Sequence, residues 1–160
     1  MPAIMKRHFF SFLLTVCVIF LALLSCNGSG SSYSGERVIS TDELPEAAKA
    51  FLNTHFADVR VKEVVLQHRA SLTEYEVDLK GGTDLHFDRK GACTEVFCTK
   101  GSVPESVIPE VILQQIKQKR PNPVIIKYEH ENRLYEIRLI DGTEFTFNQA
   151  MRLINIDYDD

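Results

Sequence analysis

The side chains in this sequence that could do chemistry are histidines, cysteines and scattered carboxylates. His55, His68, His86 and His130 lie in four different segments, and none belongs to an H-E-x-x-H motif or adjoins a nucleophile elbow. The glycine-rich stretch GSGSSYSG is not followed by Lys and Ser or Thr, so it is not a phosphate-binding loop. We therefore predict that the protein is not an enzyme, has no catalytic residues and holds no cofactor.

Carboxylates suggest calcium only weakly. Asp157, Asp159 and Asp160 are the last acidic residues, and Asp84 and Asp88 flank one expected strand. Calcium prefers clustered carboxylate oxygens, but no D-x-D-x-D-G loop gathers these five side chains. We predict no metal site, and we keep a small-ligand or Ca²⁺-responsive envelope sensor as the alternative function.

Two of the four cysteines, Cys93 and Cys98, belong to the expected folded part. A C-x4-C pair without a second pair or clustered histidines is a poor zinc signal. Five residues of extended strand span about 17 Å, whereas bridged Cα atoms lie within about 7 Å. The odd spacing also places the two side chains on opposite faces of a strand, so we predict that these thiols do not bridge each other.

The N-terminus has the pattern of a secretory signal. Lys6 and Arg7 precede an apolar run, Phe9–Leu24, that is shorter than the roughly 20 residues needed to span a bilayer. We assign residues 1–25 to a signal peptide. Their removal takes the net charge from −4 to −6, and this acidic balance argues against a nucleic-acid partner.

The end of the apolar run, LLSC, resembles a bacterial lipobox, in which the cysteine becomes the lipidated first residue. Cys26 would carry the lipid, and residues 26–41, which begin Gly/Ser-rich, would form a flexible tether. We expect an exported, periplasmic protein that contacts a membrane, the outer one, by its lipid anchor only. An uncleaved anchor, or an ordinary signal with Cys26 merely nearby, stays open.

The rest of the sequence contains an internal repeat. Tyr75–Val96 aligns without a gap with Tyr135–Ile156, and six of the 22 positions are identical. Upstream, Leu44-Pro45-Glu46 matches Ile108-Pro109-Glu110. We therefore predict tandem repeats at residues 42–99 and 103–160.

Each repeat switches from helical to strand periodicity. Ala48, Leu52 and Phe56 form a helical stripe, while Tyr75, Val77 and Leu79 alternate with acidic residues as in a half-buried strand. Gly-Gly and Asp-Gly pairs then mark tight hairpins. The predicted fold is α+β, with two tandem repeats. Each has one helix and a roughly four-stranded antiparallel meander, and the helices cover one face of the sheet.

This order of a helix, a strand and the hairpin YEVDLKGGTDLHFDRKGACTEV, followed by the same again, resembles the tandem PepSY-like family of bacterial periplasmic proteins. That family shares its architecture with the secreted β-lactamase inhibitor protein. The resemblance implies adjoining sheets with a concave open face, and binding or inhibition of another exported protein without catalysis. In the second copy Asn148-Gln149-Ala150 replaces the Asp-x-x-Gly turn.

We therefore expect a non-catalytic binding or inhibitor-like module that engages an exported protein or peptide through the open face. A peptidase inhibitor is a third possibility, although no inhibitory loop is identifiable. The residues expected to line that face carry mixed charge, with an apolar spot at Cys93 and Leu153. They are Glu76, Asp78, Asp84, His86, Cys93, Glu95, Arg138, Glu144, Thr146, Leu153 and Asn155.

Overall fold

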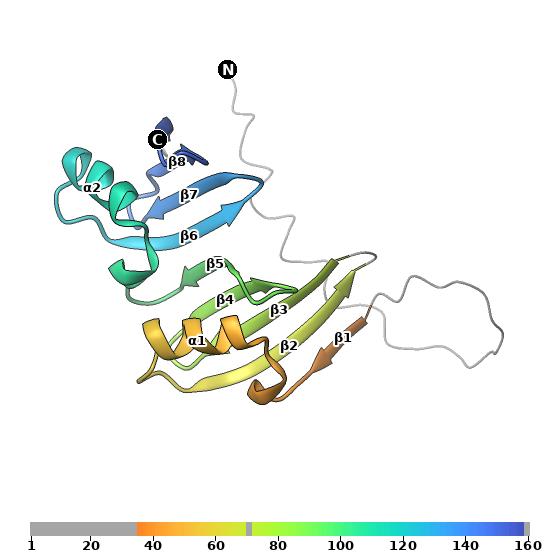
Figure 1. Cartoon of the computed structure of the whole chain (residues 1–160). Coiled ribbons are helices and arrows are strands. Elements are labelled where there is room, and N and C mark those ends of the chain that lie inside the picture. Colours follow the sequence, from red (N-terminus) through yellow and green to blue (C-terminus); the bar gives the residue numbers. More distant parts are fainter. Residues whose placement is uncertain (1–34, 70–71, 159–160) are drawn as a thin grey trace, which may run out of the picture. The chain divides into compact units, whose positions relative to one another are not determined.

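The computed structural model describes residues 35–69 and 72–158, and these form an α+β fold (Figure 1). The expected signal peptide, Cys26 and residues 27–34 lie outside the described residues. The helices are α1 (Glu46–His55) and α2 (Glu110–Lys119), with short 3-10 turns η1 (Thr41–Glu43) and η2 (Glu105–Val107). The strands are β1 (Gly35–Val38), β2 (Val61–Arg69), β3 (Leu72–Leu79), β4 (Thr83–Asp88), β5 (Cys93–Cys98), β6 (Ile125–Glu131), β7 (Leu134–Leu139), β8 (Glu144–Asn148) and β9 (Leu153–Asp157).

The nine strands form one antiparallel sheet in which each strand pairs with the next in sequence. We call residues 35–99 the first half and residues 103–158 the second half. The halves meet where β5 pairs with β6, with Val96 opposite Tyr128. Within the described ranges, no helix is both long and apolar enough to cross a membrane.

Strand β1 lies inside the segment 26–41 for which the sequence predicts a tether. It pairs with β2, and Arg37 forms an ion pair with Glu43 at 2.9 Å. The side chain of Ser40 then accepts a hydrogen bond from the Asp42 N–H group in a capping box that begins η1. The sheet therefore extends further towards the N-terminus than composition indicates.

Both helices begin directly after a proline, because a missing N–H group costs nothing at a helix start. Helix α1 buries Ala48 and Leu52 against the sheet, and the Phe51 ring meets the Phe87 ring edge-on at a centroid distance of 5.6 Å. Helix α2 buries Ile112, Leu113 and Ile116 in the same manner. Each helix thus supplies one apolar stripe to the core.

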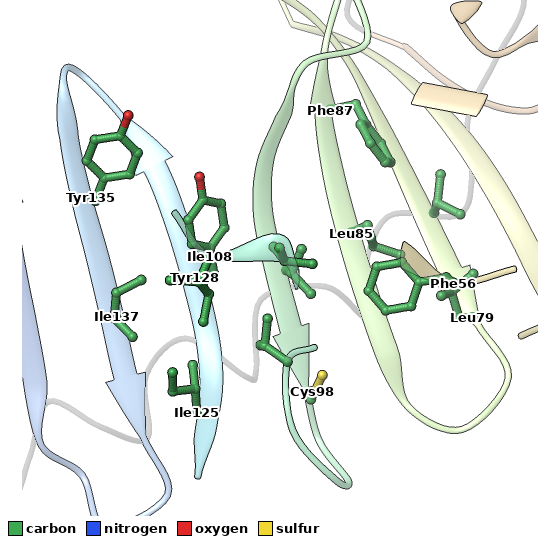
Figure 2. Packing of buried hydrophobic residues seen from close by; sticks show 14 of the residues in the cluster. Phe56, Leu79, Leu85, Phe87, Cys98, Ile108, Ile125, Tyr128, Tyr135 and Ile137 are labelled. Atoms are coloured by element: carbon green, nitrogen blue, oxygen red, sulfur yellow. The ribbon is translucent and has the colours of Figure 1, made fainter. Parts of the chain in front are cut away.

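The core face of the sheet consists of every second residue along the strands. Leu85 and Phe87 lie on the same side of β4 (Figure 2), and both are fully buried. In the second half, Ile137, Phe145 and Phe147 are buried to a similar degree. Every buried residue among those described lies between positions 39 and 147, so the part of the chain from Ser34 onward contains its own core.

A bulge near the start of β5 changes which face Cys93 occupies. Phe87 lies opposite Cys93 whereas His86 lies opposite Glu95, so Thr94 is an extra residue. Cys93 therefore shares the helix-covered face with Phe87 and packs against the core. The prediction that Cys93 lies on the open face is wrong. The prediction that Cys93 and Cys98 face opposite ways is also wrong, and both are free thiols.

The same correction applies to Leu153. A bulge in β9 places Leu153 opposite Phe147 and Asn155 opposite Thr146. Leu153 consequently packs against the core, and the extra residue, Ile154, is exposed. The expected apolar spot on the open face does not exist at these positions.

The turn before each bulge is stabilised in the same way in both halves. The Asp88 carboxylate accepts the N–H groups of Lys90 and Ala92 at 2.8 and 2.9 Å. Gly91 between them has φ +85°, and a Cβ there would lie 2.8 Å from the backbone nitrogen of Ala48 in α1. This glycine lets the turn approach the helix.

In the second half, Asn148 replaces the aspartate, and its side-chain oxygen accepts two equivalent N–H groups, both at 3.0 Å. Met151 occupies the glycine position with φ 56°. The Gln115 amide of α2 donates to the Met151 carbonyl at 2.8 Å. The turn that departs from the family pattern in sequence therefore keeps its geometry.

The close approach at Gly91 predicts a large cost for a single methyl group. We expect Gly91→Ala to lower the free energy of unfolding by about 2 kcal/mol or more, because positive φ and a backbone clash add. Gly101→Ala is the matched control, since Gly101 has φ +79° and open space around it. We expect it to lose only about 1 kcal/mol. Urea denaturation measures both, and equal losses would contradict the close contact.

Candidate functional site

The open face of the sheet, opposite the helices, carries a row of polar side chains in successive cross-strand positions. We call this the glutamate row. From β3 to β9 its members are Glu76, His86, Glu95, Glu129, Glu136, Thr146 and Asn155. Five of these seven residues are predicted from the sequence, and Glu129 and Glu136 are not.

A second row of side chains lies beside the first on the same face, displaced by two residues along each strand. Its members are Asp78, Asp84, Phe97, Lys127, Arg138, Glu144 and Asp157. The structure thus brings nine of the eleven predicted site residues onto one face. The other two are Cys93 and Leu153.

Like charges lie directly opposite one another where the halves join. Glu95 pairs with Glu129 across β5 and β6, and Glu129 pairs with Glu136 across β6 and β7. Like charges at such positions destabilise a sheet. The Lys127 ammonium contacts the Glu129 carboxylate and lies 3.6 Å from that of Glu95. One lysine therefore serves two carboxylates, and Glu136 has no ion-pair partner among the described residues.

This crowding shifts the protonation equilibria. Partial burial raises the pKa of Glu136, and the charges of Glu129 and Glu144 raise it further. Partial burial lowers the pKa of Lys127, but its hydrogen bond to Glu129 and the charges of Glu95 and Glu129 outweigh that effect, so the pKa rises overall. The ammonium is held charged, whereas Glu136 resists ionisation.

The first half of the open face is also acidic. Partial burial raises the pKa of Asp84, and the neighbouring Asp78 and Glu76 raise it further. Lys62 donates to Asp78 at 3.0 Å, and the Gln67 amide donates to Glu76 at 2.7 Å. These contacts hold the carboxylates of Asp78 and Glu76 in place. Lys62 balances only one of the three negative charges of Glu76, Asp78 and Asp84.

The second half differs in having an arginine that donates twice to one carboxylate oxygen, and an apolar pair. Arg138 donates to Glu144 through Nε and Nη2, at 3.0 and 2.6 Å. Beyond the buried pair Ile125 and Leu139, the Ile140 N–H group donates to the Val124 carbonyl at 2.9 Å. Val124 and Ile140 lie one residue beyond the ends of β6 and β7 and are 42% and 67% exposed. If the alternation of the strands continues, their side chains point to the open face.

The first half has cations at the equivalent ladder position. The Lys80 N–H group donates to the Arg60 carbonyl at 2.8 Å, as Ile140 does to Val124. The same place in the fold therefore accepts two charged residues in one half and two exposed aliphatic residues in the other. The sequence alignment pairs Lys80 with Ile140, but the exposure of Ile140 emerges only from the register.

The remaining candidate groups do not gather into a site. Burial raises the pKa of the Cys93 thiol to about 12, which makes it a poor nucleophile. The His55 ring lies 2.9 Å from the Ser106 hydroxyl, and the His130 ring stacks on Tyr135 at 4.0 Å. In the part of the chain that the structure describes, no three His, Cys, Asp or Glu side chains are placed to hold a metal ion.

A cavity of about 270 Å³ lies away from the open face, between α1 and the edge of the core. Its lining mixes apolar residues, among them Leu52, Phe56 and Leu79, with polar ones, among them Lys49 and Asp42. No residue predicted for the site lines it. The open face is therefore the surface that unites the predicted residues.

Two overlapping segments, residues 35–92 and 73–155, match the family model described as "Putative beta-lactamase-inhibitor-like, PepSY-like". Together they cover nearly all the described residues. No curated protein matches the chain significantly.

Solved structures of Bacteroides proteins, each described as a "putative" periplasmic protein, share the fold. One from Bacteroides vulgatus is 32% identical, with 76% of this chain and 96% of that chain covered and a TM-score of 0.73. One from Bacteroides thetaiotaomicron, described as "a putative calcium-regulated periplasmic protein", is 31% identical, with 76% and 96% covered and a TM-score of 0.74. Another from Bacteroides vulgatus is 29% identical, with 77% and 99% covered and a TM-score of 0.72. The two family matches and these shared folds show that the chain belongs to the PepSY-like, β-lactamase-inhibitor-like family.

Proposed function

We propose that this protein is a non-catalytic exported module that binds another exported protein or peptide through the open face of its sheet. The observation that carries the proposal is the set of like-charged neighbours Glu95, Glu129 and Glu136. Their mutual repulsion opposes folding, and Lys127, which pairs with Glu95 and Glu129, leaves Glu136 without an ion-pair partner among the described residues. A surface that lowers stability in this way is expected where it serves recognition.

The proposal also rests on duplication, which would give two similar binding surfaces side by side. We infer that each half is one copy of a unit with one helix and four strands. Tyr75 pairs with Phe87 as Tyr135 pairs with Phe147. A bulge also follows at the same place in each copy. The inferred copies also differ, because β1 precedes the first copy and the charges on the open face are not the same.

The structural neighbours are described as periplasmic, which supports an exported protein. We further propose attachment to the outer membrane through a lipid on Cys26, as the lipobox-like sequence indicates. Mass spectrometry of the native N-terminus can check the modification. Such an anchor would hold the binding module at the membrane surface within the periplasm.

Reversing charge on the open face should weaken partner binding without unfolding the protein. The pair Glu76→Lys and Glu144→Lys changes one carboxylate in each half. We expect the immobilised chain from Ser34 onward to lose most of its capture of envelope proteins. The melting temperature should fall only slightly, because both side chains are partly exposed, although Glu144 loses its ion pair with Arg138.

The matched control reverses two exposed carboxylates on the helices, Glu46→Lys and Glu110→Lys. It changes the net charge equally and leaves the open face intact. Capture that falls equally in both variants, or that survives in the first, would remove the open face from the proposed function. Unfolding of the first variant would mean that the sheet faces are assigned the wrong way round.

The stability cost of Glu136 should depend on pH. Because its pKa is raised in the folded state, ionisation disfavours folding at neutral pH. This penalty begins to shrink as the pH falls to that raised pKa, and it is gone below the ordinary pKa of a glutamate. We expect Glu136→Gln to melt at a higher temperature than the wild type at pH 7, and the difference to shrink towards pH 4. A glutamine variant that melts lower at pH 7, or a difference independent of pH, would contradict the repulsion.

The alternative function, a Ca²⁺-responsive envelope sensor, is favoured by one observation: a neighbour of 31% identity is described as calcium-regulated. A ligand that binds only the folded state must raise its stability. We expect millimolar Ca²⁺ to leave the melting temperature unchanged relative to chelator, because no three of the described His, Cys, Asp or Glu side chains are placed to hold a metal ion. A clear rise with Ca²⁺ would favour the sensor instead.

A further inference from the structure

We propose that the partner presents a basic, extended polypeptide segment, with a cation over Glu129 and Glu136 and an apolar side chain over Val124 and Ile140. This inference rests on the proposed function, because it names the chemistry of the partner bound at the same face. It follows from the charge balance of the two rows and from the difference between the halves.

The charge balance of the open face favours a cationic partner. Across the two rows, eight positions are carboxylates and two, Lys127 and Arg138, are cations. Both cations are already engaged, by Glu95 and Glu129 and by Glu144. Lys62 of β2 pairs with Asp78 at 3.0 Å. The other four carboxylates, Glu76, Asp84, Glu136 and Asp157, have no ion-pair partner among the described residues, and a basic segment would be attracted to them.

Among the acidic residues of β6, β7 and β8 in these rows, Glu136 is the one without an ion-pair partner in the described part of the chain. Its direct neighbours across the ladder are Glu129 and Thr146, so no cation lies opposite it. The charges of Lys127 and Arg138 lower its pKa, but burial and the charges of Glu129 and Glu144 outweigh them. The Glu129 and Glu136 carboxylates belong to adjacent strands, about 5 Å apart at Cα. A single ammonium or guanidinium group placed between them would form charge-assisted hydrogen bonds to both and would relieve their repulsion.

Val124 and Ile140 provide the second contact. Because Arg60 and Lys80 occupy the equivalent place in the first half, the fold does not require apolar residues there. The two aliphatic side chains are nevertheless exposed, at 42% and 67%. Covering them would bury apolar surface that the isolated protein leaves in water.

The spacing of the two contacts defines the partner further. Glu129 and Glu136 lie on β6 and β7, and Val124 and Ile140 directly adjoin the ends of these strands. Glu136 and Ile140 are four residues apart, or about 13 Å where the backbone stays extended. In an extended segment, side chains four residues apart point the same way and match this distance. The partner segment is therefore expected to carry lysine or arginine and an aliphatic residue at positions i and i+4.

Three labelled peptides of equal length test this chemistry against the chain from Ser34 onward by fluorescence anisotropy at low salt. The first has lysine and leucine four residues apart, the second has serine in place of leucine, and the third has glutamate in place of lysine. We expect the first to bind most tightly, the second more weakly and the third not at all.

Two variant pairs locate the contacts. Glu129→Gln with Glu136→Gln should weaken the first peptide about tenfold, the usual scale for losing a charge-assisted contact. Glu46→Gln with Glu110→Gln changes the net charge equally on the helices and should weaken it less than twofold. Val124→Thr with Ile140→Thr should abolish the preference for the leucine peptide while leaving the serine peptide unchanged.

The outcomes separate this inference from the proposed function. Equal weakening by the two glutamate pairs would mean non-specific attraction and would overturn the inference. So would the absence of peptide binding in a protein whose capture of envelope partners still depends on Glu76 and Glu144, and in that case the proposed function would stand. If capture does not depend on the open face either, the proposed function itself falls.

Discussion

An extended strand places successive side chains on opposite faces, and this period of two is the constraint on which the rest of the structure depends. Once α1 and α2 cover the face formed by Val77, Phe87 and Ile137, the intervening residues must lie together on the other face. Glu76, His86 and Glu136 are therefore brought together by the burial of their neighbours. Packing of the core residues is thus sufficient to place the side chains of the candidate site on one face.

The junction between the halves adds a property that neither half has alone. Pairing of β5 with β6 places Glu95 opposite Glu129, and Lys127 moderates their repulsion. The pairing of β5 with β6 gains no stability from two carboxylates that lie opposite each other. The charge at the seam is better explained by a contact outside the chain than by the stability of the sheet.

Much of the fold is predictable from the sequence, because its signals are local. Proline before each helix, alternation in β3 and β7 and the Gly-Gly and Asp-Gly turns all mark elements that the structure contains. The two bulges are not predictable in this way, since one extra residue in β5 or β9 leaves no mark in composition. That single residue, Thr94 in one half, moves Cys93 from the expected face to the core side.

The site is predictable only where alternation is clear. Arg138 and Glu144 follow from strict alternation in their strands, whereas Glu129 lies in IIKYEHE, where apolar and polar residues do not alternate. Its place beside Glu95 depends on the register between β5 and β6, which joins segments separated by a helix. The exposure of Val124 and Ile140 is likewise not predictable from residue type, since both are aliphatic. It becomes clear only when the hydrogen bond between them places both residues beside the ends of β6 and β7.

Carboxylate footprinting of the protein bound to its captured partner tests the central claim most directly. Carbodiimide coupling modifies accessible acids, and mass spectrometry reads the modification at each position with and without the partner. The account predicts protection of Glu129, Glu136 and Glu144, with Glu46 and Glu110 on the helices labelled as in the free protein. Protection of the helix carboxylates while those of the open face react as before would contradict it.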